Sequence, residues 1–188
     1  MASIERFKMA ALASAATWVA ALAVPAQAMT RVVELNVLNA TAMLTTPIAS
    51  GDTLLLDTTV TQETGPLTQS ITFTLGAGVT SLTGFASWQI STATGPGPRL
   101  TGVNIDVFDS MNTLVLSDAF TGSLGGFAMS SLNGPVGAGT YRMVATGTAV
   151  RDAVLNISVS AVPEPGVYAM LLAGLGVVGL RARRRYLG

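Results

Sequence analysis

The stretch Leu155-Asn156-Ile157-Ser158-Val159 alternates apolar and polar residues without a break. Successive side chains of a β-strand point to opposite faces of the sheet, so this pattern predicts a strand with one buried and one solvated face. The same alternation occurs at Ile71-Thr72-Phe73-Thr74-Leu75, at Val103-Asn104-Ile105-Asp106-Val107 and across residues 33–37. These stretches together predict an all-β fold.

Further apolar segments are separated by turn-forming glycine, proline and asparagine residues. Eight or nine short strands of this kind predict an antiparallel β-sandwich over residues 29–161. A jelly roll or a partly open barrel is the alternative, because spacing along the chain does not reveal strand order. The glycine-rich segment 116–139 is weakly patterned, and we expect irregular loops there. The additional predicted strands are Thr53–Val60, Phe85–Ser91, Thr113–Phe120 and Tyr141–Thr146.

Six aromatic residues occupy positions within the predicted strands. Most aromatic side chains at alternating strand positions are buried, so we expect these six to form the aromatic core. The alternative is that some of them line a carbohydrate-binding surface. The six residues are Phe73, Phe85, Trp88, Phe108, Phe120 and Tyr141.

The charge of the middle of the chain argues against nucleic-acid binding. Residues 29–160 contain four basic and eight acidic side chains, so this region is acidic and would repel a phosphate backbone. The whole sequence contains no cysteine and no histidine. It therefore has no thiol nucleophile, no disulfide, no Ser-His-Asp triad and no histidine ligand for a metal.

The acidic residues Asp106, Asp109 and Asp118 form a cluster along the sequence. Calcium prefers oxygen ligands of this kind, but no Asp-x-Asp-x-Asp-Gly loop is present. We therefore interpret the cluster as solvated surface, and we predict no metal, no cofactor and no catalytic residue. If the protein hydrolysed a glycan, the reaction would need two carboxylates about 5–10 Å apart in a cleft.

The N-terminal residues 1–28 have the order of a secretory signal peptide. The positive charges of Arg6 and Lys8 precede an alanine-rich apolar run over residues 9–24, which a proline ends. Small residues follow at the positions that a signal peptidase admits, and we expect cleavage after Ala28. A buried N-terminal helix of the domain is the alternative. The two small residues are Ala26 and Ala28.

The C-terminal part begins with Val162-Pro163-Glu164-Pro165, whose prolines favour an extended chain that a protease can grip. The charge-free stretch 166–180 would span about 22 Å as a helix, less than the ~30 Å hydrocarbon core of a bilayer. Arginines after it can snorkel to the interface and orient the preceding domain outside. We therefore expect a transmembrane helix over residues 167–180, with a peripheral helix packed on the domain as the alternative. The orienting residues are Arg181, Arg183, Arg184 and Arg185.

The Pro-Glu-Pro element, the glycine-rich apolar stretch and the arginine end together resemble the PEP-CTERM sorting domain of Gram-negative bacteria. The likeness covers residues 162–185 and defines a sorting signal over residues 162–188. It implies recognition by exosortase, a membrane-embedded cysteine protease-transpeptidase of species that make exopolysaccharide. It implies nothing direct about residues 29–161. The recognition residues in this interpretation are Pro163, Glu164 and Pro165.

The sequence therefore predicts an exported protein without catalytic activity, anchored in the inner membrane as an intermediate. The resemblance implies that it is then delivered to the cell surface or extracellular matrix. Its expected partners are signal peptidase and the export machinery, exosortase, the inner membrane and exopolysaccharide. One alternative is a carbohydrate-binding module or weak glycan hydrolase. Exposed, coplanar aromatic rings in one groove would favour the carbohydrate-binding function. Another is a self-assembling matrix protein, which long exposed edge strands would favour.

Overall fold

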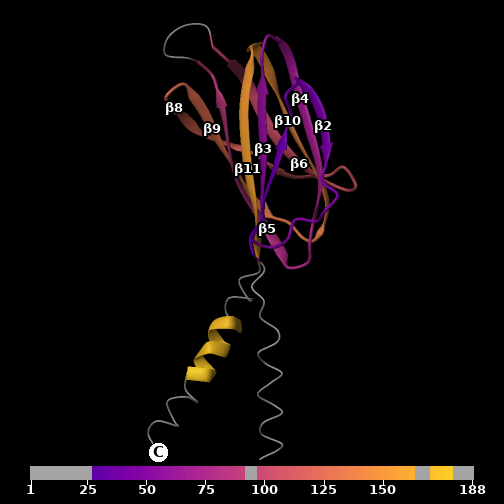
Figure 1. Ribbon diagram of the computed structural model, residues 1–188, viewed down its shortest axis with the longest axis vertical. Helices are drawn as coiled ribbons and strands as arrows, with labels where there is room; N and C mark the ends of the chain where they lie inside the picture. The colour runs from indigo at the N-terminus through magenta and orange to yellow at the C-terminus, as the bar shows by residue number, and fades with distance from the viewer. Residues whose placement is uncertain (1–26, 92–96, 164–169, 180–188) are drawn as a thin grey trace, which may run out of the picture.

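The computed structural model describes residues 27–91, 97–163 and 170–179. The strands of these residues form two sheets that pack face to face as the expected β-sandwich (Figure 1). In spatial order the first sheet contains β1 (Thr30–Glu34), β3 (Thr53–Val60), β11 (Ala153–Pro163), β5 (Val79–Gln89), β9 (Phe127–Pro135) and β8 (Ala119–Leu124). The second contains β2 (Asn39–Met43), β4 (Gly65–Leu75), β10 (Gly139–Arg151), β6 (Arg99–Asp109) and β7 (Leu114–Ser117).

The expectation of a purely antiparallel sandwich is wrong at one edge of each sheet. Strand β1 pairs with β3 in parallel, and β2 pairs with β4 in parallel, while the other pairings are antiparallel. Parallel neighbours need a connection longer than a hairpin, and the β1–β3 connection provides it because it contains β2. Alternation of side chains reports which face is buried, and it carries no information on strand direction.

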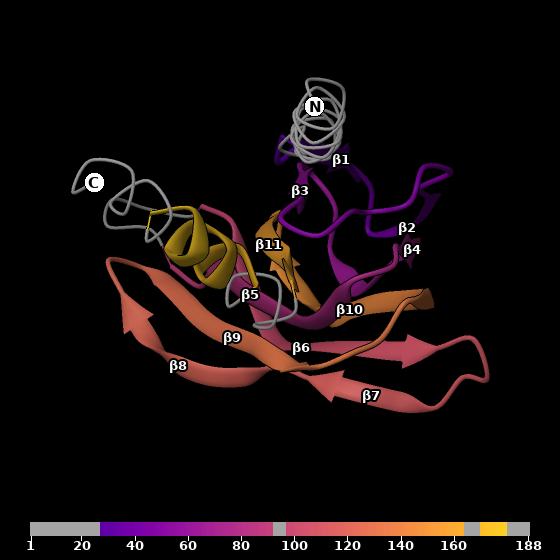
Figure 2. The ribbon, with the colours of Figure 1, turned by 90° about the horizontal axis from the view of Figure 1, so that it is seen from below.

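The chain crosses from one sheet to the other at both edges (Figure 2). At one edge β1 of the first sheet is followed by β2 of the second. At the other edge only Asp118 separates β7 of the second sheet from β8 of the first. The Asp118 carboxylate accepts a hydrogen bond from the Ile105 backbone N–H at 2.8 Å, and the Asp118 N–H donates to the Ile105 carbonyl at 2.9 Å. These bonds fix the place where the chain changes sheets.

The irregular loops expected over residues 116–139 are not what the structure contains, because β8 and β9 form a hairpin there. Two of the six glycines of this segment are adjacent and form its turn. Gly125 and Gly126 both adopt positive φ angles, of 60° and 87°, a conformation that glycine enters without steric cost. This glycine pair therefore marks the hairpin turn, and the other glycines of the segment do not prevent β8 and β9 from forming strands.

The core lies between the sheets and is mainly aliphatic, with Phe73, Trp88 and Tyr141 as its aromatic members. The expectation of six core aromatics is wrong for Phe85 and Phe120, which are 47% and 67% exposed. Phe85 and Trp88 lie three positions apart on β5, so their side chains must point to opposite faces. Central aliphatic members of the core are Leu54, Leu56, Ile71, Ile105, Val107, Leu155 and Ile157.

Phe120 and Phe108, the sixth expected core aromatic, lie at the margin of the sandwich. Phe120 is on the edge strand β8, where its ring packs against Trp88 with centroids 6.5 Å apart. Phe108 is half-buried on β6, and the Arg142 guanidinium lies over its ring at 4.9 Å. An edge position or an outer face therefore leaves these two rings in contact with solvent.

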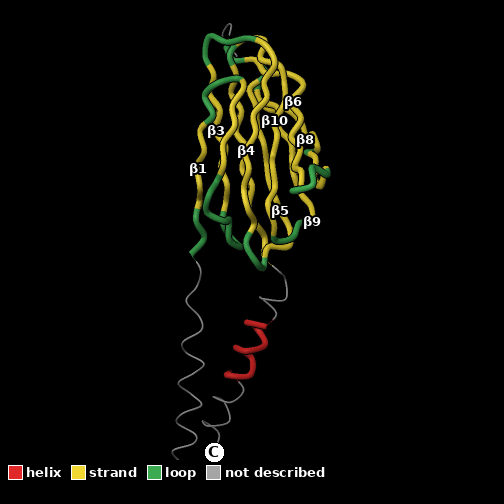
Figure 3. The backbone as a smooth tube through the Cα atoms, turned by 90° about the vertical axis from the view of Figure 1, so that its right-hand side faces the viewer, coloured by secondary structure: helices red, strands yellow, loops and turns green. Residues whose placement is uncertain are grey.

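The apolar C-terminal segment forms a helix over residues 170–179, within the expected range of 167–180 (red in Figure 3). Within the ranges that the structure describes, no helix has both the length and the apolar character needed to cross a membrane.

Candidate functional site

Both ends of the sandwich domain meet at one pole of the molecule, which we call the terminal pole. Thr30 at the start of β1 pairs with Thr53 at the start of β3, and Thr53 pairs with Ser160 near the end of β11. The chain therefore enters the sandwich beside the place where it leaves it, as Figure 3 shows. The predicted signal peptide and the predicted sorting signal attach to the same pole.

Asp52 is the residue that holds the two ends of the domain together. Its carboxylate accepts hydrogen bonds from the backbone N–H of Met29 at 2.8 Å and of Ala49 at 3.0 Å. Its backbone carbonyl accepts the N–H of Ala161 at 2.9 Å, and the Gly51 N–H donates to the Ala161 carbonyl at 2.7 Å. One turn thus contacts both the residue before β1 and a residue near the end of β11.

Asp52 is only 4% exposed, and its surroundings favour the charged form. Burial by itself raises the pKa of this carboxyl, but the hydrogen bonds from Met29 and Ala49 and the nearby Arg31 guanidinium outweigh burial and hold the pKa below its usual value. The Arg31 Nη2 atom lies 3.7 Å from the carboxylate and donates to the Pro47 carbonyl at 3.0 Å. The carboxylate is therefore an ionised group within the folded turn.

Sequence reasoning missed Asp52, because nothing in the Ala-Ser-Gly-Asp sequence distinguishes it from an ordinary turn aspartate. Its partner Met29 is 23 positions away, and Ala161 is more than 100 positions away. Only the pairing of β1, β3 and β11 brings these residues together. A lone acidic residue between small turn residues is the only sequence signal, and it is a weak one.

The predicted sorting residues lie only partly within the described ranges. Pro163 is the last residue of β11, half-buried and paired with Val79 across a register shift. Ala28 is exposed just before Met29. The remaining predicted residues lie outside the described residues: Ala26, Glu164, Pro165, Arg181, Arg183, Arg184 and Arg185.

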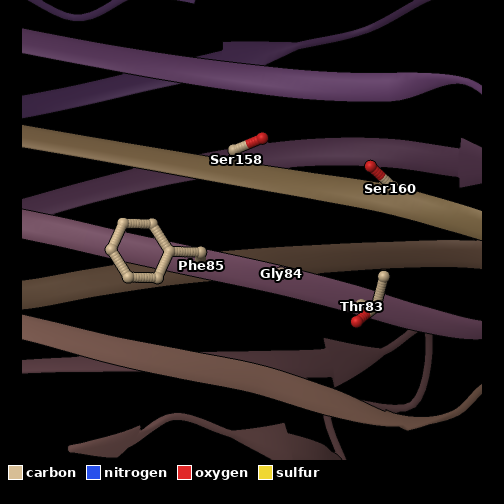
Figure 4. A pocket seen from close by; sticks show the side chains of 5 residues that line it. All are labelled: Thr83, Gly84, Phe85, Ser158 and Ser160. Atoms are coloured by element: carbon tan, nitrogen blue, oxygen red, sulfur yellow. The ribbon is translucent and has the colours of Figure 1, made fainter. Parts of the chain in front are cut away.

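The outer face of the first sheet carries a shallow depression of about 250 Å³ around Phe85 (Figure 4). Phe85 pairs across the sheet with Ser158, and Thr83 pairs with Ser160. We call this depression the Phe85 face; it also includes Gly84. It offers one aromatic ring and several hydroxyl groups, and it contains no carboxylate.

A second depression, of about 280 Å³, lies on the second sheet beside the β6–β7 hairpin. It contains the carboxylate of Asp109, whose Oδ1 accepts the backbone N–H of Met111 at 2.9 Å and of Thr113 at 2.8 Å. The Arg142 guanidinium donates to the side-chain oxygen of Asn112 at the same place. This depression has a single acidic group, so it lacks the carboxylate pair that glycan hydrolysis requires.

The acidic cluster of the sequence is divided between separate structural tasks. Asp109 caps the β6–β7 turn, Asp118 fixes the crossing between the sheets, and Asp106 accepts a hydrogen bond from the Asn104 side chain at 2.6 Å. Among the described residues, no group of three or more acidic, cysteine or histidine side chains is placed to hold a metal ion.

Comparisons with known proteins identify the C-terminal signal. Residues 161–185 match the family model described as the PEP-CTERM protein-sorting motif. No curated protein matches the chain. Among solved structures, the pre-peptidase C-terminal domain of a collagenase from Bacillus anthracis is similar with a TM-score of 0.35 and 12% identity; the similarity covers 71% of this chain and 97% of that one. The chain thus carries the sorting motif that its C-terminal residues predict.

Proposed function

We propose that this chain is an exported surface or extracellular-matrix protein that exosortase sorts through its C-terminal signal, and that it has no catalytic activity of its own. Signal peptidase removes residues 1–28, and the apolar segment 167–180 then anchors an intermediate in the inner membrane. Exosortase acts at Pro163-Glu164-Pro165. The single observation that supports this best is the match of residues 161–185 to the PEP-CTERM motif.

The position of the two chain ends supports the proposal. A signal peptide and a C-terminal anchor occupy the same membrane before processing, so a folded domain between them needs both of its ends on one side. Thr30 and Ser160 both neighbour Thr53 at the terminal pole, which meets this requirement. A domain whose ends lay at opposite poles would need long linkers to satisfy it.

The exposure of the C-terminal helix also supports an anchor. Every described residue of the helix over 170–179 is exposed, and large apolar side chains such as Met170, at 77%, and Leu172, at 68%, cover it. A peripheral helix packed on the domain would bury one face, as amphipathic helices do. An apolar surface left open in this way is typical of a segment that binds a membrane or another protein.

Carbohydrate binding remains the second candidate, and Phe85 is the observation that favours it. Its ring is 47% exposed on a face of serine and threonine hydroxyls. A single ring is fewer than the coplanar set that the sequence hypothesis asks for. The self-assembling matrix hypothesis has less support, because the edge strands β1, β2, β7 and β8 are only four to six residues long.

The proposal is tested by intact-mass measurement of the protein from culture medium and from the inner membrane, in cells with and without the sorting protease. We expect a secreted form that begins at Met29 and lacks everything beyond the Pro-Glu-Pro element. When the protease is absent, protein that keeps its full C-terminal tail should accumulate in the membrane. A soluble form that keeps Arg181 to Arg185 in both strains would overturn the proposal.

A point substitution separates sorting from folding. Glu164→Ala changes the recognition element, whereas Glu34→Ala changes an exposed glutamate of β1 and serves as the matched control. We expect Glu164→Ala to retain the tail in the membrane and Glu34→Ala to be processed normally. Equal processing of the two variants would remove Glu164 from the recognition element.

A further inference from the structure

Met29 is held at the terminal pole by contacts with the domain. The Thr53 backbone N–H donates to the Met29 carbonyl at 2.9 Å, which continues the β1–β3 ladder by one residue. The Met29 N–H donates to the Asp52 carboxylate at 2.8 Å. Both contacts involve atoms of residues 29, 52 and 53, so they do not depend on any residue before Met29.

Cleavage after Ala28 changes the chemistry of the Met29 nitrogen. Hydrolysis breaks the bond between the Ala28 carbonyl carbon and the Met29 nitrogen; the hydroxyl of water goes to Ala28, and its hydrogen goes to Met29. The new α-amino group has an ordinary pKa of about 7.7–8.0, so it carries a positive charge below that range. A neutral amide donor 2.8 Å from a buried carboxylate thereby becomes an ammonium group.

We propose that removal of the signal peptide creates the cation that pairs with the buried Asp52 carboxylate, so that the mature domain contains an ion pair that its precursor lacks. This inference rests on the proposed export and on cleavage after Ala28. Processing at the N-terminus would then stabilise the turn that also holds Ala161, next to the sorting signal.

The surroundings of Asp52 leave a place for this cation. Oδ1 accepts from Met29, while Oδ2 accepts from Ala49 and faces Arg31. The guanidinium lies 3.7 Å away, beyond hydrogen-bond distance, and part of its donor capacity is directed to Pro47. An ammonium on Oδ1 would form the short charge-assisted bond that Arg31 does not form. Arg31 would repel it in part, and the shared carboxylate between them offsets this repulsion.

The sequence provides a selective way to test the pair. Lys8 is the only lysine in the chain, so a protein that begins at Met29 has its α-amino group as its sole primary amine. Acetylation of the mature protein from the culture medium therefore modifies Met29 alone, removes its charge and restores the amide of the precursor. Reductive dimethylation is the matched control, because it modifies the same nitrogen and keeps the positive charge.

The measurement is urea unfolding of the unmodified, acetylated and dimethylated proteins, with mass spectrometry confirming the start at Met29. We expect acetylation to raise the unfolding equilibrium constant about tenfold, equivalent to about 1.4 kcal/mol, and dimethylation to change it less than about threefold. In Asp52→Asn protein, acetylation should have no such effect. If that variant does not fold, the difference in stability between the acetylated and the dimethylated protein is sufficient to test the ion pair.

Two failures are distinguishable. A mature protein that begins at a residue other than Met29 would overturn cleavage after Ala28, and the ion pair with it. A protein that begins at Met29 but loses no stability on acetylation, or loses as much on dimethylation, would overturn the ion pair and leave the export proposal in place.

Discussion

The hydroxyl of Thr58 donates a hydrogen bond to the side-chain carbonyl of Gln69, and both side chains are completely buried. Thr58 belongs to β3 of the first sheet and Gln69 to β4 of the second, so this polar contact crosses the core. The Gln69 amide donates in turn to the backbone carbonyls of Leu35 at 2.9 Å and Val37 at 3.1 Å. Gln69 therefore pairs the polar groups that the chain would leave unsatisfied where it crosses from β1 to β2.

Replacing Gln69 by leucine should lower the free energy of unfolding by about 2–4 kcal/mol. The apolar side chain has a similar size, but it leaves the Thr58 hydroxyl, the buried Leu35 carbonyl and the part-buried Val37 carbonyl without this partner. Each buried group left unpaired costs about 1–3 kcal/mol when other contacts cannot relax. Urea unfolding measures the loss. Gln89→Leu, on the outer side of β5, is the control and should change stability by less than about 1 kcal/mol. Equal stability of Gln69→Leu and the unmodified protein would contradict the bridging role.

Acidification should destabilise the domain through Asp52. Its folded-state pKa lies below the unfolded value of about 3.9, so its contribution is fully present above that value and is lost as the pH falls through the folded pKa. Arg31 is the charged side chain that faces it. We expect Asp52→Asn to show a shallower decrease in unfolding free energy below about pH 4 than the unmodified protein. Parallel stability curves for the two proteins would show that Asp52 is not involved.

Truncation should cost much more stability at Phe73 than at Phe85. Phe73 is 1% exposed and its ring centroid lies 6.2 Å from that of Tyr141, so Phe73→Ala should cost about 3–5 kcal/mol. Phe85 is on the outer face, so Phe85→Ala should cost less than about 1 kcal/mol. Thermal or urea unfolding compares them. A loss at Phe85 as large as at Phe73 would mean that the outer face is covered in solution.

The Phe85→Ala variant also tests the second candidate function. If the Phe85 face binds a glycan, the variant should lose retention on immobilised exopolysaccharide while its unfolding curve stays near that of the unmodified protein. A matched change on the other sheet, Thr72→Ala, should keep retention. Retention that is unchanged in both variants argues against a glycan site at Phe85.

The mature protein should end at Pro163 or later. Ala161 is held by two backbone hydrogen bonds to the Gly51-Asp52 turn, and β11 stays paired with β5 as far as Pro163. A protease that binds an extended segment would have to unpair this strand to cut earlier. The intact mass of the secreted form, with fragmentation of its C-terminal peptide, locates the end. A product that ends before Ala161 would show that the strand opens during processing.

Strand content was accessible from the sequence because side-chain alternation is a local property. The segment Thr53–Val60 was predicted with the bounds that β3 has, and the alternating stretches around Phe73 and Ile157 are indeed half-buried strands. Segments with mixed or glycine-rich patterns, such as β8 and β9, were lost. Strand β8 is an edge strand that exposes both faces, so its contrast between apolar and polar positions disappears. Strand β9 lies between β5 and β8 and does bury one face, but the small residues Ala128 and Ser130 occupy two of its buried positions and weaken the pattern.

The relationships that position the terminal pole were not accessible in this way. The parallel pairing of β1 with β3 depends on how far β2 carries the chain before it returns, and Asp52 meets Met29 and Ala161 only through that pairing. The role of Gln69 was equally hidden, because an isolated glutamine in a threonine-rich strand resembles a solvent-facing residue. The C-terminal motif differs because its three parts are contiguous, so the sequence alone identified it.

The strand that ends at Pro163 also sets how far the protein reaches. Strand β11 has eleven residues, and at about 3.4 Å per residue it is roughly 35 Å long. At its other end the Asp152 carboxylate accepts the backbone N–H of Gln62, which ties together the two turns there. If the tail anchors the protein as proposed, the sandwich is attached to the membrane at the terminal pole alone. The turns at the other end would then be the part of the domain farthest from the membrane, and contacts with the surroundings would begin there.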